Sequence, residues 1–225
     1  MHRVFLVSLL LILCVALSVP AQTTLPIVEE VEWEPLRNHC RQLMKMIDKG
    51  DGKGGVTPPL PAETVRALQQ LLAKKADDPN AAVRAVQKLL DPHCLLAVSI
   101  NPESRVKAMR GPAIAKLRQN EETIVLLKIH NDGGVTHQLR LRGPEITRAG
   151  ERGEDRWLRA VLVVDAPFGA KLSGRRLEYR LLRLTPREAG KREATFQFDV
   201  GQGTQDLGFR AEVPVLFSIR EAKRD

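Results

Sequence analysis

The feature that most constrains this chain is a single change in hydrophobic spacing at Cys94. Before Cys94, apolar residues recur every three to four positions, as on one face of a helix; after it they alternate every second position, as in strands. A helical run followed by strands only does not predict alternating βα units with a parallel sheet. We therefore predict an α+β protein, with about three helices in residues 22–92 and a β domain in residues 93–225.

The first predicted helix begins at Pro35, because proline suits the first helical position. Leu36, Cys40, Leu43 and Ile47 would then form one apolar stripe along it. Residues 50–61 (GDGKGGVTPPLP) are rich in glycine and proline, so they predict a linker without regular structure.

Two further helices are predicted after this linker. One spans about residues 61–76, with Val65, Leu68 and Leu72 on one face. The other begins at Asp78-Pro79, an N-cap residue followed by proline at the first helical position, and ends before Pro92.

Short strands separated by turn residues, without helices between them, indicate an antiparallel Ig-like β-sandwich. The nearly continuous apolar run 158–164 predicts a strand that is buried on both faces. The predicted strands are 96–100, 124–129, 137–142, 158–164, 177–181, 194–198 and 213–219.

Residues 1–21 have the pattern of a secretory signal peptide. A short positive start at Arg3 precedes an apolar run from Val4 to Val19, and small residues precede a cleavage point after Ala21. We expect the mature protein to be secreted or periplasmic, with no membrane span after cleavage. Retention of the segment as a membrane anchor is the alternative.

Cleavage at this point would remove Cys14 and leave Cys40 and Cys94. Two cysteines in an oxidising compartment predict one disulfide, Cys40–Cys94. It would connect the helical region to the start of the β domain.

Net positive charge is concentrated in the β domain. The formal charge is +8 for the whole chain, and acids and bases are equal in number between Gln22 and Pro92. If the strands that carry the arginines are neighbours, their outer face could bind an acidic polysaccharide. The competing interpretation is an ordinary solvated surface. Nucleic acid is not an expected ligand, because the protein is predicted to be exported and has few aromatic residues. The arginines concerned are Arg140, Arg142, Arg176, Arg180 and Arg183.

A candidate metal site lies at the turn Asn131-Asp132-Gly133-Gly134. A two-residue hairpin loop at Gly133-Gly134 would place His130 opposite His137, with Asp132 beside them. Two histidines are an incomplete catalytic set, so solvated hairpin residues are the simpler interpretation. No G-x-S-x-G nucleophile motif, H-E-x-x-H zinc motif or phosphate loop ending in Lys-Ser/Thr occurs in the chain, so we predict neither enzymatic activity nor a cofactor.

Three segments, NPESRVKAMRGPA (101–113), LLKIHNDGGVT (126–136) and REATFQFDVGQGTQDLGFRAEVPVLF (192–217), carry a family resemblance. They resemble a non-catalytic N-terminal region of exported bacterial metallohydrolases with a PHP (polymerase and histidinol phosphatase) domain. In that family the chemistry belongs to the PHP domain, which opens with an H-x-H metal motif, and no H-x-H occurs here. The resemblance therefore implies a stand-alone accessory region, and no catalytic residue carries over.

These observations lead to three hypotheses about function. The first is an exported, non-enzymatic binding or accessory module of the cell envelope, whose partner would be an envelope protein. The second is an acidic-polysaccharide binder that uses the arginines. The third is a small metal-binding protein centred on His130 and His137.

Overall fold

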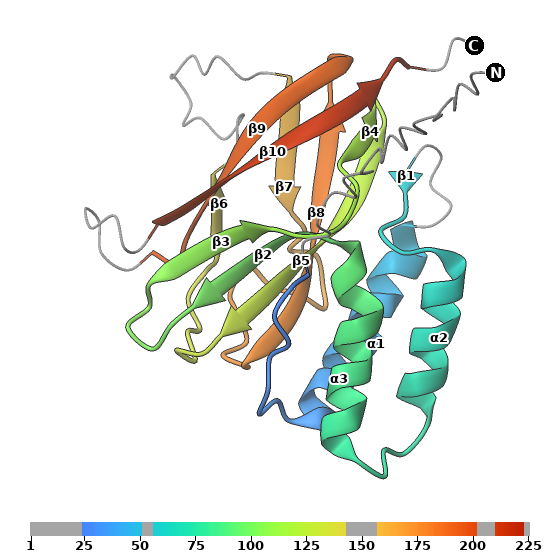
Figure 1. Ribbon diagram of the computed structural model, residues 1–225, viewed down its shortest axis with the longest axis vertical. Coiled ribbons are helices and arrows are strands. Elements are labelled where there is room, and N and C mark those ends of the chain that lie inside the picture. Colours follow the sequence, from blue (N-terminus) through green and yellow to red (C-terminus); the bar gives the residue numbers. More distant parts are fainter. Residues whose placement is uncertain (1–23, 51–55, 143–156, 202–209, 223–225) are drawn as a thin grey trace, which may run out of the picture.

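The computed structural model describes residues 24–50, 56–142, 157–201 and 210–222. Three layers follow one another: the helices, a six-stranded sheet and a four-stranded sheet (Figure 1). The elements in chain order are α1 (Trp33–Gly50), β1 (Val56–Thr57), α2 (Ala62–Ala73), α3 (Pro79–Leu90), a 3-10 turn (Asp91–His93), β2 (Cys94–Ile100), β3 (Val106–Arg110), β4 (Lys116–Arg118), β5 (Glu122–Asn131), β6 (Arg140–Arg142), β7 (Leu158–Leu162), β8 (Leu177–Pro186), β9 (Gly190–Asp199) and β10 (Arg210–Arg220).

The three predicted helices are confirmed. α1 buries the predicted stripe, with Leu36, Cys40, Leu43 and Ile47 all at most 3% exposed. The Asp78 side chain caps α3 by accepting hydrogen bonds from the amides of the second and third helical residues, and Pro79 occupies the first position. The helix boundaries differ from the prediction by up to three residues.

The helices cover one face of the six-stranded sheet rather than forming a separate core. Leu43 of α1, Leu68 of α2 and Val86 of α3 belong to the same hydrophobic cluster as Leu126 of β5 and Tyr179 of β8. Helices as short as α2 and α3, with 12 residues each, are marginal in isolation and gain their stability from such packing. The helical region and the β region therefore share one interface.

The prediction of an antiparallel sandwich is wrong in detail, because both sheets are mixed. The strand order is β3-β2-β5-β8-β7 in the six-stranded sheet, with β1 also paired to β5, and β4-β10-β9-β6 in the other. β2 pairs parallel with β5, and β4 pairs parallel with β10. After the β2–β3 hairpin, the chain crosses to the second sheet as β4 and returns as β5, and such a crossover permits parallel pairing.

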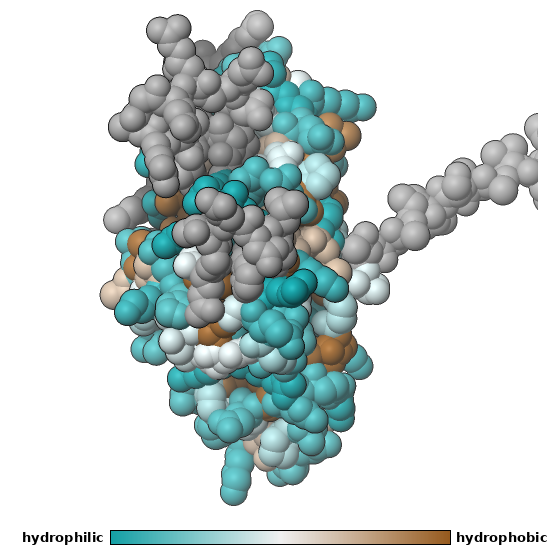
Figure 2. All heavy atoms as spheres, turned by 90° about the vertical axis from the view of Figure 1, so that its left-hand side faces the viewer, coloured by the Kyte–Doolittle hydropathy of each residue, from teal (hydrophilic) through white to brown (hydrophobic). Residues whose placement is uncertain are grey.

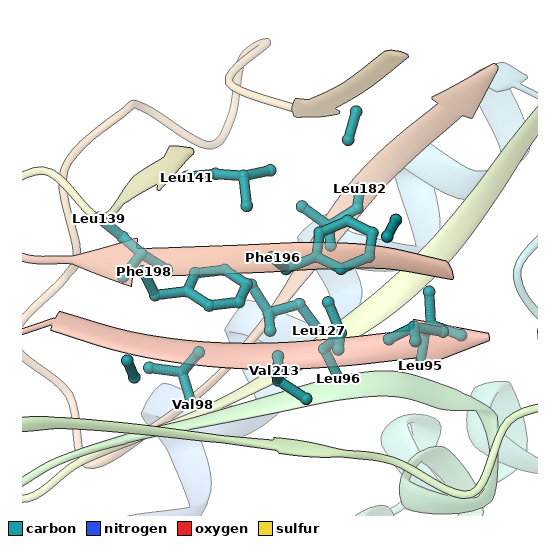
Figure 3. Packing of buried hydrophobic residues seen from close by; sticks show 14 of the residues in the cluster. Leu95, Leu96, Val98, Leu127, Leu139, Leu141, Leu182, Phe196, Phe198 and Val213 are labelled. Carbon is teal, nitrogen blue, oxygen red and sulfur yellow. The ribbon is translucent and has the colours of Figure 1, made fainter. Parts of the chain in front are cut away.

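A second hydrophobic core fills the space between the two sheets. Leu96 and Val98 of β2 and Leu127 of β5 face Phe196 and Phe198 of β9 across this space (Figure 3). Side chains at alternate positions of β2 and β5 therefore pack against different layers, as strand geometry requires. Both faces of the central strands are buried.

Three strands were not predicted, and one was assigned the wrong environment. β1 lies in the segment expected to be an irregular linker, β3 is a five-residue strand with charged residues at Lys107 and Arg110, and β4 is only three residues long. β7 was expected to be buried on both faces, but it is an edge strand whose Arg159 and Val161 are exposed. A short apolar run by itself does not distinguish a central from an edge strand.

The predicted signal peptide, residues 1–21 with Cys14, lies outside the described residues. Within the described ranges, no helix is long and apolar enough to cross a bilayer. Viewed from the side that faces left in Figure 1, the described surface is largely hydrophilic, with hydrophobic residues in separate patches (Figure 2).

Candidate functional site

A groove of about 270 Å³ lies on the helix-side face of the six-stranded sheet, where the helices leave β2 and β3 uncovered. We call it the β2 groove. β2 forms its floor, β3 and β5 flank it, and the extended segment 25–28 forms one wall. Its lining residues are Leu25, Pro26, Ile27, Val28, Ala97, Val98, Ser99, Lys107, Ala108, Met109, Lys128 and His130.

The sheet register arranges this lining in two rows. Ala97 of β2 pairs with Met109 of β3 and with Lys128 of β5. Two residues further along β2, Ser99 pairs with Lys107 and with His130. Residues two apart on a strand face the same side, so one row is mainly apolar and the next is polar.

The apolar part of the groove is exposed to solvent. Met109 is 44% exposed and Ile27 is 38% exposed. Single exposed hydrophobic residues are common on proteins, but these two line the same hollow with the buried Leu25 and the small Ala97. A concave apolar surface with a few polar groups is the usual form of a ligand site.

Segment 25–28 is fixed in place by a side chain of α3. The Gln87 amide nitrogen donates to the Val28 carbonyl and its oxygen accepts from the Val28 amide, each at 2.8 Å. Gln87 is fully buried. The wall of the groove is therefore held by hydrogen bonds and not only by packing.

A buried ion pair supports the same wall from below. The Lys128 ammonium lies 2.7 Å from a carboxylate oxygen of Asp91 and also donates to the Pro26 carbonyl and to Gln87. An ammonium group has three protons, so all its donors are used. The charge of Lys128 is thus neutralised within the protein and is not available to a ligand.

The other oxygen of the same carboxylate accepts a hydrogen bond from the Tyr179 hydroxyl at 2.8 Å. Burial raises the pKa of Asp91, and the hydrogen bond and charge of Lys128 oppose this shift. Burial also raises the pKa of Tyr179 well above its usual value, and the negative charge of Asp91 adds to the effect. The network is satisfied and enclosed, as a structural core element requires.

His130 contributes an imidazole to the polar row of the groove. Desolvation lowers its pKa, the nearby Asp132 opposes this, and Arg176 and Lys128 add to the lowering. The ring is therefore mostly neutral near pH 7.

The structure does not place the five predicted arginines on one face. Arg140 and Arg142 lie on β6 of the four-stranded sheet, and both pair with Asp199. Arg180 lies on β8 of the other sheet, is buried and forms an ion pair with Glu178 at 3.1 Å. The expectation that Arg180 lies on an outer face is wrong.

The remaining two arginines are also paired. Arg176 pairs with Glu30 and Asp132, and Arg183 lies 2.9 Å from Glu122. Sequence alternation placed these charges on strands but could not show that acids from other elements neutralise them.

The predicted metal site at the Gly133-Gly134 turn is not formed. His130 belongs to β5 and pairs with Leu177 of β8, whereas the backbone of His137 bonds Leu172, so the two histidines are not opposite one another. Asp132 pairs with Arg176 instead. The described residues contain no group of three or more His, Cys, Asp or Glu that could hold a metal ion.

The predicted Cys40–Cys94 disulfide is absent from the structure, in which both cysteines are free and buried. They belong to the same hydrophobic cluster between helices and sheet. Burial raises the pKa of the Cys40 thiol to about 12 and that of Cys94 well above its usual value. Buried thiols of this kind are chemically inert.

Sequence reasoning missed the groove and its supporting residues. Lys128 interrupts an otherwise apolar strand, and Asp91 follows a leucine pair at a helix end. Lone charges within apolar segments indicate a buried partner, because an isolated buried charge is too costly. The sequence did not show which residues were partners.

No family model matches the chain, and no curated protein matches it. Among solved structures, it is similar to the ASH/PapD-like domain 7 of human CEP192, at 12% identity over 60% of this chain and 89% of that one, with a TM-score of 0.30. It is also similar to the cysteine protease inhibitor EhICP2 of Entamoeba histolytica, at 12% identity over 55% and 95% of the two chains, with a TM-score of 0.25. TM-scores this low support no inference about function.

Proposed function

We propose that this protein is an exported, non-enzymatic binding module of the cell envelope and that the β2 groove is its binding surface. One observation carries the proposal: an open, largely apolar groove whose wall, segment 25–28, is fixed by buried hydrogen bonds. Binding to a preformed surface avoids the entropic cost of ordering it. The export itself rests on the signal-peptide pattern of residues 1–21.

Polysaccharide binding by the five arginines has less support from the structure than from the sequence. All five are engaged with acidic residues, and Arg180 is buried. A polyanion would have to compete with these acids for each guanidinium.

We further infer that the two sheets form an Ig-like sandwich, of the kind expected for an accessory region. Two sheets facing each other over a common core support this, whereas the parallel pairs β2–β5 and β4–β10 are a departure. The resemblance to PHP-associated regions stays a prediction.

The test uses three forms of the protein as baits in envelope extract. They are the wild type, a variant Ser99→Trp whose new side chain fills the groove, and a control Thr195→Trp on the exposed face of β9. Retained molecules are identified by mass spectrometry, and circular dichroism checks folding. We expect a species held by the wild type and Thr195→Trp but lost from Ser99→Trp. Identical retention by all three contradicts the groove as the binding surface, and turnover of an ester or phosphoester that His130→Ala abolishes contradicts a non-enzymatic role.

A further inference from the structure

The two rows of the β2 groove have opposite chemistry, and this restricts what the groove can hold. Lys107, Ser99 and His130 lie side by side on three neighbouring strands, forming the polar row. Strands are roughly 4.8 Å apart, so the outer members of the row are about 10 Å apart at the backbone. Their side chains have room to converge on one small polar group above Ser99.

The charge of this row is a single positive unit. Lys107 is exposed and makes no ion pair with a described residue, whereas the Lys128 ammonium is neutralised by Asp91. His130 is mostly neutral, and no acidic side chain lines the groove. One cation, one hydroxyl and one imidazole complement a group with one negative charge.

The adjoining surface suits an aliphatic tail. The small side chain of Ala97 leaves space above β2. Beside it, Met109, Ile27 and Leu25 supply aliphatic or thioether surface. No Phe, Tyr or Trp lines the groove, so a large planar ligand has little surface to stack on there. The volume of about 270 Å³ is close to the lower limit of small-ligand pockets, roughly 300 Å³.

We propose that the β2 groove binds an aliphatic monocarboxylate of short or medium chain length, with its carboxylate on Lys107, Ser99 and His130 and its tail along Ala97 and Met109. This inference rests on the proposed binding function and names the ligand class. A dianionic phosphate monoester fits less well, because a single unpaired cation offers it too little charge. An extended peptide is the competing occupant.

The test titrates the exported protein with octanoate, below its micellar concentration, by calorimetry. We expect saturable binding to the wild type and binding weaker by about tenfold or more for Lys107→Gln, because a charge-assisted contact is lost. Lys116→Gln, which removes an exposed lysine from β4 on the other sheet, should bind like the wild type. Acetate, which lacks the tail, and 1-octanol, which lacks the charge, should both bind more weakly than octanoate.

A second measurement reports on the position of the carboxylate. A negative charge beside His130 favours the imidazolium, so octanoate should raise the pKa of His130 in a proton NMR titration. The ring resonances of the exposed His137 serve as the control and should not move when octanoate is added at constant pH. An unchanged pKa of His130, or equal spectral changes at both histidines, contradicts this placement.

Two outcomes overturn the proposal. Absence of saturable octanoate binding, or equal affinity for octanoate and 1-octanol in both the wild type and Lys107→Gln, rules out the carboxylate site. If the envelope extract still yields a protein whose capture Ser99→Trp abolishes, the groove binds a polypeptide, and the binding function stands without this ligand class. If capture is also independent of the groove, both proposals fail.

Discussion

The Lys128 ammonium and the Asp91 carboxylate form an ion pair at 2.7 Å between the helices and the sheet, with side chains only 3% and 9% exposed. One comes from the central strand β5 and the other from the turn after α3. The pair therefore joins the two halves of the chain at the base of the β2 groove.

Removing one member of this pair should destabilise the protein strongly. Lys128→Met leaves Asp91 buried without its counter-charge, and breaking such a pair costs about 3 kcal/mol or more. Urea denaturation should show this loss in the free energy of unfolding, and Lys107→Met on the exposed face should change it little. Exposed ion pairs contribute up to about 1 kcal/mol, so a decrease in the free energy of unfolding below that value would mean that buried Asp91 does not need the charge of Lys128.

The hydrogen bonds of Gln87 should control the order of segment 25–28. Gln87→Ala removes both bonds to Val28 and one from Lys128, for a loss of roughly 2 kcal/mol. The segment should then be cut faster by a glutamate-specific protease at Glu29 or Glu30. Gln70→Ala, a matched change on the exposed face of α2, is the control, and equal cleavage of the two variants would contradict the anchoring role.

Stability should fall as the pH is lowered from about 6.5 to about 4, in part because of His39. Burial lowers the pKa of His39 from 6.5 to about 4, with Glu178 opposing the shift and Arg180 and Arg175 adding to it. Between these values the unfolded chain binds the proton that the native state excludes, so protonation favours unfolding, by up to about 3 kcal/mol.

His39→Gln keeps a hydrogen-bonding side chain facing the backbone of Tyr179 but cannot titrate. Its free energy of unfolding should depend less on pH across this window than that of the wild type. The lowered pKa values of His93 and His130 act in the same direction and leave a residual slope. A pH dependence identical to that of the wild type would show that His39 does not titrate in this window.

The cysteines should be unreactive until the protein unfolds. Cys40 and Cys94 are buried with raised thiol pKa values, so a maleimide at pH 7 should label neither in the native state. In denaturant, two labels would confirm free thiols and the loss of Cys14, whereas three would show that the N-terminal segment is retained. No labelling in denaturant would mean that the protein contains the Cys40–Cys94 disulfide.

Local patterns predicted the local structures well. The stripe through Leu36 and Leu43 and the cap at Asp78 depend on residues a few positions apart, so the sequence contains all the information needed. β3 escaped prediction because its apolar residues do not alternate regularly with its charged ones, and its hairpin pairing with β2 stabilises it.

The candidate site depends on distant residues, and for that reason it was not predicted. Lys107, Ser99 and His130 become neighbours only through the registers of β2 with β3 and with β5. A shift of one residue in either register would turn a strand's side chains to the other face. The pairing of distant strands also explains why His130 does not lie opposite His137 and why Arg180 is buried.

The sequence by itself determined that three amphipathic helices precede a set of alternating strands, because hydrophobic period and capping act over a few residues. Only the tertiary structure decided that β2 and β5 run parallel, that Lys128 finds Asp91, and that segment 25–28 forms a wall beside β2. These relationships join residues far apart in the chain. They are set by which arrangement buries the most apolar surface while leaving no buried charge unpaired, and that comparison requires the whole fold.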